Sequence, residues 1–375
     1  MPGKAVSKQS RSANQTGGGP GRWWHTIDDG ARLQCDLCPR ACVLKDGDRG
    51  FCFVRQNIGR QMILTTYGLS SGFSVDPIEK KPLYHFLPGT TALSFGTAGC
   101  NLGCQFCQNW SISKSRQAAV LSQPASPDQV AKMAVQLKCA SVAFTYNDPV
   151  IWAEYAIDTA RACHRRGIRT VAVTSGYISP EARPEFFSVM DAVNVDLKAF
   201  SELFYRRLTL SHLKPVLNTL SWLRLSGKVW FEITNLLIPG ENDSPQEGER
   251  MCRWIVENLG SDVPVHFTAF FPSFRLLDKP ATPAAIVIRA REQALAAGIR
   301  YAYVGNIFDF ERGYTYCAGC GQCLIERGYH QLAAYRLKGN RCSSCSEVIP
   351  GVFEEKRIGT GSQNGLPLGP VRLRT

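Results

Sequence analysis

Short apolar runs alternate with amphipathic segments through the middle of the chain. Seven of these runs have the length and the bounding turn residues of strands that are buried on both faces. They lie at residues 92–96, 141–145, 169–174, 192–197, 229–237, 263–268 and 301–304. Helical stretches lie between most of them, and buried strands that alternate with helices predict a parallel sheet with helical crossovers.

Four helix starts carry recognisable signals. Residues 126–129 read Ser-Pro-Asp-Gln and residues 244–247 read Ser-Pro-Gln-Glu, so both match a capping box with proline at the first helical position. The pairs Ser179-Pro180 and Thr282-Pro283 have the same order of residue types. We therefore expect helices to begin at all four places.

The number of strands limits the architecture. Residues 91–306 hold all seven strand candidates, whereas a complete eight-stranded barrel takes about 250 residues. An incomplete, TIM-like barrel of the (β/α)6 type therefore fits this α/β pattern. A doubly wound open sheet is the alternative, but its first turn is usually rich in glycine, and residues 97–104 place cysteines in that turn. In both architectures the loops after the carboxyl ends of the strands carry the chemistry.

Composition divides the chain into five parts. We predict a basic tail at 1–22, a cysteine-bearing region at 23–87, an α/β core at 88–311, a small cysteine domain at 312–355 and a second basic tail at 356–375. The tails are expected to be disordered because they cannot bury enough apolar surface to fold. No apolar run is long enough to span a membrane, and residues 1–22 lack the apolar segment of a secretory signal. We therefore expect a cytoplasmic protein.

The net charge of +12 is concentrated at the ends of the chain. The two tails supply eight of the excess positive charges, which leaves the body between them only mildly basic. Such a body lacks the electrostatic footprint of a nucleic-acid groove. The charge is therefore attributed to solvated tails, and nucleic acid is not expected as the main partner.

Fifteen cysteines are many for a chain without an export signal. In a reducing compartment such thiols are more often metal ligands than disulfides. Twelve of them fall into three tight groups, and Cys139, Cys163 and Cys252 stand alone in apolar or helical segments. Isolated cysteines in such segments behave as small buried hydrophobes, so no function is assigned to them.

The central group, Cys100, Cys104 and Cys107, has the spacing C-x3-C-x2-C. A structural zinc ion takes four ligands, but no further cysteine or histidine follows in the next several residues. Three thiolates on one short loop suit three corners of a [4Fe–4S] cluster and leave one iron open. A zinc site with a distant fourth ligand, or three unrelated cysteines, are the alternatives.

This loop, with a strand in front of it and Phe106 before its last cysteine, resembles the signature of radical S-adenosylmethionine (SAM) enzymes. Segments at 75–89, 99–113, 144–149, 193–200, 232–244 and 303–307 further resemble the radical SAM enzymes of the AmmeMemoRadiSam system, which are related to the activating enzymes of pyruvate formate-lyase. The likeness covers residues 30–355. It implies a radical SAM barrel in which the open iron binds SAM. It further implies that the reduced cluster cleaves SAM to a 5′-deoxyadenosyl radical, which abstracts hydrogen from a substrate.

The resemblance also implies which residues bind this cofactor. Residues 144–149 read Phe-Thr-Tyr-Asn-Asp-Pro, and related enzymes use the corresponding segment to bind the amino group of SAM. Asn147 and Asp148 would supply polar acceptors there, while Thr145 would shape the edge of the site. A polar turn in which Asp148 caps the next helix is the alternative.

Later strand ends extend the same pocket. Ser175 stands where the family commonly has asparagine and is expected beside SAM, and Gly176 would allow a close approach of the backbone. Asp196 and Lys198 alternate along a strand and so point to one face, where buried charges need a partner or a ligand. The resemblance places this pair near the SAM carboxylate. His266 is a further candidate for the SAM pocket, with a structural role as the alternative.

Two outer groups of cysteines predict metal sites of other kinds. Two C-x2-C pairs, 21 residues apart, predict a zinc ribbon formed by Cys317, Cys320, Cys342 and Cys345, with Cys323 as a spare or alternative ligand. Near the N-terminus the spacing is C-x2-C-x3-C-x9-C. This spacing suits either zinc or a second [4Fe–4S] cluster, held by Cys35, Cys38, Cys42 and Cys52.

The sequence leaves the substrate open. The resemblance implies a protein or another macromolecule that is activated or modified, and an electron donor such as a flavodoxin or a ferredoxin. A radical SAM enzyme that modifies RNA is one alternative. A zinc-ribbon protein that binds nucleic acid without catalysis is another, but the intact cysteine loop and the Asp196/Lys198 pair argue against it.

Overall fold

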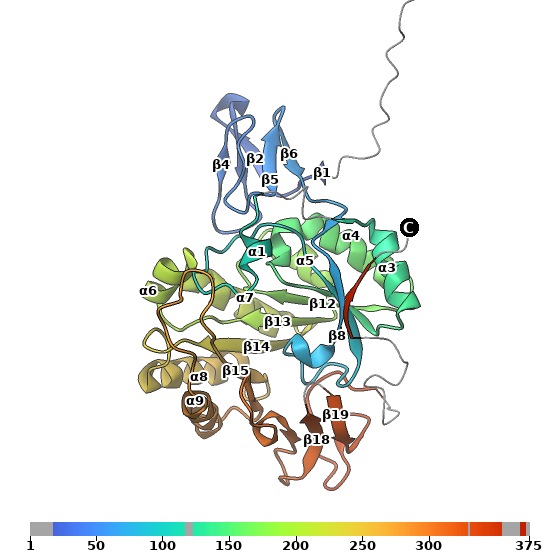
Figure 1. The fold of residues 1–375 in the computed structure, drawn as a ribbon, viewed down its shortest axis with the longest axis vertical. Coiled ribbons are helices and arrows are strands. Elements are labelled where there is room, and N and C mark those ends of the chain that lie inside the picture. The colour runs from blue at the N-terminus through green and yellow to red at the C-terminus, as the bar shows by residue number, and fades with distance from the viewer. Residues whose placement is uncertain (1–17, 117–122, 329–330, 355–367, 373–375) are drawn as a thin grey trace, which may run out of the picture.

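The computed structural model describes residues 18–116, 123–328, 331–354 and 368–372. Within these residues the chain builds a nine-stranded sheet with helices on its outer side (Figure 1). Seven of its strands are parallel: β9 (Thr91–Phe95), β11 (Ser141–Phe144), β12 (Arg169–Thr174), β13 (Ala192–Asp196), β14 (Trp230–Leu237), β15 (Val265–Ala269) and β16 (Ala302–Gly305). All seven predicted strands are present, with bounds shifted by at most two residues.

The strand order confirms the predicted barrel. Neighbouring strands follow the chain from β9 to β16, without the reversal of order that defines a doubly wound sheet. Every residue of β11 is buried, as is nearly all of β13, which explains their continuous apolar sequence. The result is a partial, open barrel in which all seven parallel strands end at one rim.

Helices cross over between the strands. The longer ones are α3 (Pro127–Gln136), α4 (Ala153–His164), α5 (Arg183–Ser188), α7 (Leu213–Ser226), α8 (Pro245–Leu259) and α9 (Ala284–Ala296). Shorter turns are α1 (Trp110–Ser113), α6 (Glu202–Phe204), η1 (Asp28–Gly30), η2 (Ile78–Lys80), η3 (Pro149–Trp152), η5 (Glu311–Gly313) and a π-helical turn, η4 (Tyr205–Thr209).

The predicted helix starts are correct to different degrees. Ser126 forms the complete capping box of α3. Ser244 caps α8, but the Glu247 carboxylate accepts a hydrogen bond from Phe200 N instead of closing the box. Thr282-Pro283 precedes α9 as expected. The start at Ser179 is wrong, because the Ser179 hydroxyl donates to a carbonyl of the N-terminal region and the helix begins only at Arg183.

Two antiparallel strands extend the sheet beyond β9. β8 (Phe73–Pro77) pairs with β9, and β22 (Gly369–Val371) pairs with β8. The predicted boundary at residue 87 thus falls after β8, a strand that already belongs to the main sheet. Most of the two predicted tails lies outside the described residues, but β1 (Gly19–Pro20) and β22 are strands. Main-chain hydrogen bonds at an open sheet edge order these two segments despite their polar composition.

The N-terminal residues form a lobe that projects from the barrel (Figure 1). It contains two three-stranded antiparallel sheets. One consists of β2 (Trp24–Ile27), β3 (Arg32–Cys35) and β4 (Val43–Leu44), and the other of β1, β6 (Gln61–Leu64) and β5 (Arg55–Ile58). A separate pair, β7 (Leu69–Ser70) with β10 (Gln123–Pro124), links the lobe to the core. Buried leucines of the lobe belong to the same apolar core as the barrel, so the lobe is packed on the barrel.

The C-terminal residues form a small β domain that packs beside β16. Its strands are β17 (Thr315–Tyr316), β18 (Cys323–Gly328), β19 (Gln331–Tyr335), β20 (Leu337–Lys338) and β21 (Arg341–Cys342). Tyr301, Tyr303 and Ile349 share one buried cluster, so the domain is fixed to the barrel. In the described part of the chain no helix has the length and apolarity to cross a membrane.

Candidate functional site

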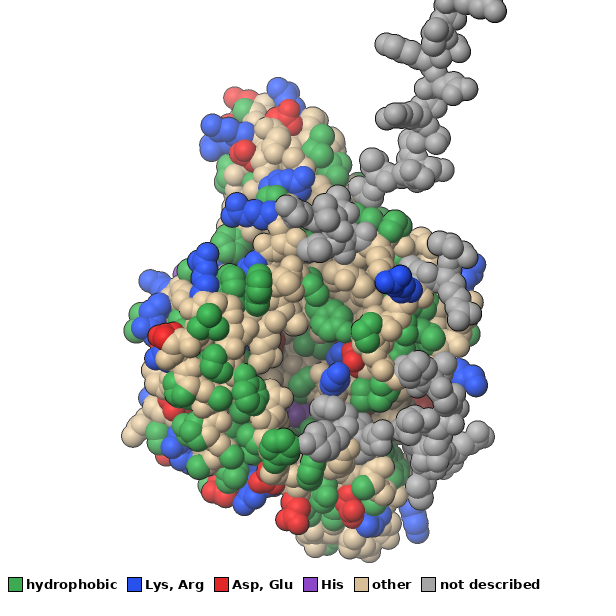
Figure 2. Space-filling view, in the orientation of Figure 1, with side chains coloured by type: hydrophobic (Ala, Val, Ile, Leu, Met, Phe, Trp, Pro, Cys, Tyr) green, Lys and Arg blue, Asp and Glu red, His purple; other side chains and the backbone are tan. Residues whose placement is uncertain are grey.

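The cysteine loop follows β9 and opens on a cavity of about 350 Å³. Cys100, Cys104 and Cys107 all line this cavity, together with Asp196 and Lys198 from the end of β13. The face seen in Figure 2 is hollowed below the N-terminal lobe, over the central sheet. The structure therefore brings the three predicted ligands together with the predicted charged pair.

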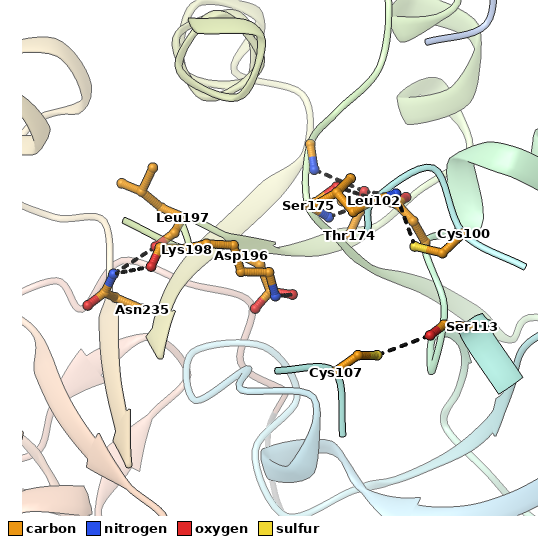
Figure 3. A network of polar contacts seen from close by, with 12 residues as sticks. Cys100, Leu102, Cys107, Ser113, Thr174, Ser175, Asp196, Leu197, Lys198 and Asn235 are labelled. Carbon is orange, nitrogen blue, oxygen red and sulfur yellow. Dashed lines mark hydrogen bonds and ion pairs between the residues drawn. The ribbon is translucent and has the colours of Figure 1, made fainter. Parts of the chain in front are cut away.

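Tertiary contacts hold the loop in place, since it has no regular secondary structure. Gly103 N donates to the Thr209 carbonyl at 2.8 Å. A Cβ on Gly103 would lie 2.6 Å from a methyl carbon of Leu210, so only glycine permits this approach. The Cys107 sulfur lies 3.1 Å from the Ser113 hydroxyl (Figure 3). The thiols are thus presented from a fixed backbone.

Asn147 supports the same loop from the next strand. Its amide nitrogen donates to the Gly99 carbonyl at 2.8 Å and lies 3.3 Å from the Thr97 hydroxyl. Its oxygen accepts from Thr97 N at 3.2 Å and from Trp152 Nε1 at 3.3 Å. Both ends of the side chain are therefore occupied by the protein. The structure places Asn147 as a support for the cysteine loop and not as a free acceptor for SAM.

Asp148 is also fully engaged. One carboxylate oxygen accepts from Val150 N at 3.1 Å and from the Thr174 hydroxyl at 2.8 Å. The other accepts from Ser175 N at 3.0 Å and from the Ser175 hydroxyl, so all of its roughly four acceptor positions are used. Burial raises the pKa of Asp148, although the hydrogen bonds from Ser175 act in the opposite direction. Asp148 is the N-cap of η3, which agrees with the alternative prediction that it caps the next helix.

Asp196 and Lys198 form an ion pair with 2.6 Å between Oδ2 and Nζ (Figure 3). Burial disfavours the ammonium of Lys198, but the Asp196 carboxylate and the sulfurs of Cys104 and Cys107 raise its pKa above the usual range. The hydroxyl of Tyr205 accepts a hydrogen bond from Lys198 N at 3.1 Å. A positive charge is therefore held between a carboxylate and the cysteine sulfurs.

Two other predicted residues, Phe106 and Thr145, are buried and line the same cavity. Thr234 lines it as well and was missed by the sequence analysis. In the pairing of β13 with β14 it lies opposite Asp196, and its buried hydroxyl has no hydrogen-bond partner. Three thiols beside an unsatisfied buried hydroxyl and an ion pair fit an iron–sulfur cluster with a polar ligand bound next to it.

A second cavity of about 450 Å³ adjoins the first. The two share four lining residues, Lys80, Pro82, Thr268 and Asn306. Three phenylalanines at the second cavity are partly or largely exposed: Phe308 at 88%, Phe271 at 49% and Phe310 at 41%. Its lining comes from segments far apart in the sequence, and no spacing pattern connects them.

His266 lies at the second cavity and not at the one that the thiols line. Its Nε2 is 2.7 Å from a carboxylate oxygen of Glu232, and its ring stacks on Tyr303 and meets the edge of Tyr84. Glu232 also accepts hydrogen bonds from the backbone N–H groups of Tyr84 and His85. These contacts agree with the alternative prediction that His266 has a structural role. The cavity that the three thiols line does not include His266.

The C-terminal cysteines converge on one point. The sulfurs of Cys317, Cys320, Cys342 and Cys345 all lie within 4.8 Å of one another, with pairs at 3.5 and 3.7 Å. Tetrahedral zinc with Zn–S bonds of about 2.3 Å holds its sulfurs about 3.8 Å apart. This four-cysteine group therefore has the geometry of a zinc ribbon, and Cys323 is not part of it.

The fold and the site together define a class of protein. Its members have a partial parallel barrel and present three thiols from the loop after the first barrel strand. The radical SAM superfamily profile matches residues 95–252. MJ0808, an uncharacterized protein of Methanocaldococcus jannaschii, is 35% identical over 329 residues, which cover 87% of this chain and 97% of that protein. The chain belongs to the radical SAM superfamily and is a radical SAM enzyme.

Solved structures with a similar fold include other radical SAM enzymes. A radical SAM methyltransferase from Sphaerobacter thermophilus is 16% identical with a TM-score of 0.47, and the alignment covers 77% of each chain. A domain of a pyruvate-formate lyase-activating enzyme from Bacteroides vulgatus is 15% identical with a TM-score of 0.40. Its alignment covers 44% of this chain and 99% of the domain.

Proposed function

We propose that the enzyme holds a [4Fe–4S] cluster on Cys100, Cys104 and Cys107 and uses it to cleave SAM reductively. The observation that carries this proposal is the convergence of the three thiols on one cavity, beside the Asp196–Lys198 pair. Of the described residues that line this cavity, no other is a cysteine or a histidine, so one iron is left without a protein ligand. When bound, the cluster and SAM together supply a 5′-deoxyadenosyl radical that takes hydrogen from a substrate.

The residues around the thiols have separate tasks in this proposal. The charged pair and the unsatisfied hydroxyl of Thr234 bind the polar end of SAM, because ion pairs and free donors at a cavity wall favour a zwitterionic ligand. Asn147 and Asp148 are positioning residues, which act through the cysteine loop and Ser175. Phe106 and Thr145 form the walls.

The substrate would occupy the adjoining cavity, and we assign it to proteins. The exposed phenylalanines at that cavity support this assignment, since exposed apolar patches at a cavity mark interaction sites. The likeness to AmmeMemoRadiSam enzymes and to activating enzymes of pyruvate formate-lyase points the same way. A flavodoxin or a ferredoxin would supply the electron, zinc would occupy the C-terminal site, and the cytoplasm would keep the many free thiols reduced.

Anaerobic turnover tests the proposed reaction. The full chain is reconstituted with iron and sulfide, reduced with dithionite and mixed with SAM, and the products are separated by chromatography. We expect 5′-deoxyadenosine and methionine in equal amounts. A reconstituted, reduced protein that binds SAM and releases neither product would overturn the proposal.

A Lys198→Met substitution is expected to weaken SAM binding by about 10- to 100-fold, the range of one charge-assisted hydrogen bond. Methionine keeps much of the side-chain length but leaves the Asp196 carboxylate unpaired at the cavity. Loss of a positive charge near two cluster ligands should also lower the reduction potential of the cluster. Anaerobic calorimetry with SAM and a redox titration measure the two effects.

Lys132→Met is the matched control, because Lys132 is exposed on α3, and it should leave both quantities unchanged. If Lys198→Met binds SAM as tightly as the unmodified enzyme does, the pair has no part in SAM binding.

A further inference from the structure

Four cysteines of the N-terminal lobe have no role in the reaction proposed above. The geometry points to a second [4Fe–4S] cluster that is bound by the thiolates of Cys35, Cys38, Cys42 and Cys52 and lies beside the loop of Cys100. Each of its four irons would have a cysteine ligand, so no iron would be left open to bind SAM.

The fold of the lobe brings the four cysteines close together. Cys35 ends β3, Cys38 and Cys42 lie in the turn to β4, and Cys52 precedes β5. A Cβ on Gly50 would lie 3.7 Å from the Cys52 sulfur and 3.8 Å from the Cys42 sulfur, so these two thiols approach the same point. Cys35 N donates to the Cys42 carbonyl at 2.9 Å, and Phe51 N, next to Cys52, lies 3.5 Å from the Cys42 sulfur.

The sulfurs of the N-terminal group are not packed as closely as those of the C-terminal four-cysteine site. Among the described residues, the C-terminal cysteines are the group whose ligand atoms all lie within 4.8 Å of one another, and the N-terminal four do not meet this limit. The central loop, Cys100 to Cys107, does not meet it either. Four thiolates on the four irons of a cube must stand farther apart than four thiolates on one zinc ion.

The chain spacing agrees with this conclusion. Residues 35–42 carry three cysteines in eight positions, and residues 100–107 do the same with the two gaps in the opposite order. The C-terminal site instead has two separated C-x2-C pairs, which is the usual arrangement for zinc. The N-terminal group therefore resembles the central cluster loop, with Cys52 as an added fourth ligand.

A buried arginine completes the site. Arg55 is 2% exposed, and its guanidinium is paired with Glu154 at 2.9 Å. Its carbonyl oxygen and the sulfurs of Cys42 and Cys52 all lie within 4 Å of the Cβ position of Gly50, so Arg55 lies beside these thiols. Its Nε is buried and has no hydrogen-bond partner. A cluster carries inorganic sulfides as well as thiolates, and hydrogen bonds to these sulfurs tune its potential. A buried N–H without a partner beside the thiols is therefore a donor that such a cluster would satisfy.

The lobe holds this site directly against the central cysteine loop. The backbone at Gly99 approaches the Cys52 carbonyl so closely that a Cβ there would lie 2.1 Å from the carbonyl oxygen. The guanidinium of Arg40, which lies between Cys38 and Cys42 in the sequence, donates to the carbonyls of Asn101 and Leu210. Gly99 and Asn101 flank Cys100, so the two groups of cysteines are connected through one short stretch of backbone.

The test uses a full-length variant that cannot form the central cluster, Cys100/Cys104/Cys107→Ala. After anaerobic reconstitution we expect about four iron atoms and four sulfides per chain in this variant and about eight of each in the unmodified enzyme. Its reduced electron paramagnetic resonance spectrum should be unaffected by SAM, whereas SAM should alter part of the spectrum of the unmodified enzyme.

The proposal is overturned if the triple variant contains no iron and its lobe holds zinc. A second variant, Cys35/Cys38/Cys42/Cys52→Ser, should lose the iron signal that the triple variant retains. If the N-terminal lobe of this second variant fails to fold, the iron content of the triple variant still decides whether the lobe binds a cluster. Iron content is measured without turnover, so failure of SAM cleavage in the unmodified enzyme is a separate result.

Discussion

Replacing Cys104 by alanine is expected to reduce the rate of 5′-deoxyadenosine formation by more than about 1,000-fold, as removal of an essential catalytic group does. Cys104 is 8% exposed and lies between the other two thiols of the loop. Without it, two ligands remain for a cluster that needs three thiolates to stay in place while one iron binds SAM. Quantification of 5′-deoxyadenosine in anaerobic single-turnover reactions measures the effect.

Cys323→Ala is the matched control for this experiment. It removes a partly exposed thiol that lies outside the four-cysteine group of the C-terminal domain, and it should cleave SAM at the unmodified rate. If Cys104→Ala retains substantial SAM cleavage, the loop is not the cluster site and the proposed function fails.

Replacing Asn147 by alanine is expected to lower both iron occupancy and the SAM cleavage rate by about 10- to 100-fold, the range found when groups that orient metal ligands are lost. The reason is local. Asn147 is 5% exposed, and its amide joins the strand end at Thr97 to the Gly99 carbonyl, one residue before Cys100. Without that amide, the loop loses its support, and three backbone groups at residues 97–99 lose a partner. Iron content after reconstitution and 5′-deoxyadenosine yield are the two measurements.

An Asn147→Asp substitution separates the hydrogen bonds that this side chain donates from those that it accepts. The carboxylate would still accept from Thr97 N and Trp152 Nε1, but it would have no N–H to donate to the Gly99 carbonyl, so it should be impaired as well. Asn258→Ala is the control, because it removes a side-chain amide that donates to a helix carbonyl on the exposed face of α8. An Asn147→Asp enzyme with full iron content and activity would show that the donor bonds do not support the loop.

The predictable part of the site is the part that lies close together in the sequence. The three thiols share one loop of eight residues, and Asp196 and Lys198 lie two positions apart on one face of a strand. The family resemblance placed the two sets in one pocket. The polar strand ends at Asn147 and Asp148 were correctly placed at this rim. The capping role of Asp148 was one of its two predicted roles. The hydrogen bonds that tie these two residues to the loop at residues 97–99 and to the end of β12 were not predicted, because those segments lie far away in the sequence.

Other features depended on pairing between distant strands. Thr234 lies opposite Asp196 only in the observed register of β13 and β14. His266 is the second residue of β15, and Glu232 on the neighbouring strand holds it at the second cavity. The edge strand β22 was missed because Gly369–Val371 has no strand-like composition, and its order comes from the exposed edge of β8.

By itself, the sequence determined the alternation of seven buried strands with helices, the cysteine loop after the first barrel strand, and the existence of two further cysteine groups. These are local patterns, since strand burial and ligand spacing are written in neighbouring residues. Only the tertiary structure decided which polar groups remain available to a ligand. It satisfies Asn147 and Asp148 within the protein, leaves the Thr234 hydroxyl and the Arg55 Nε without partners, and brings the lobe against Gly99. Hydrogen bonding between segments far apart in the chain sets these outcomes, and no short-range pattern encodes it.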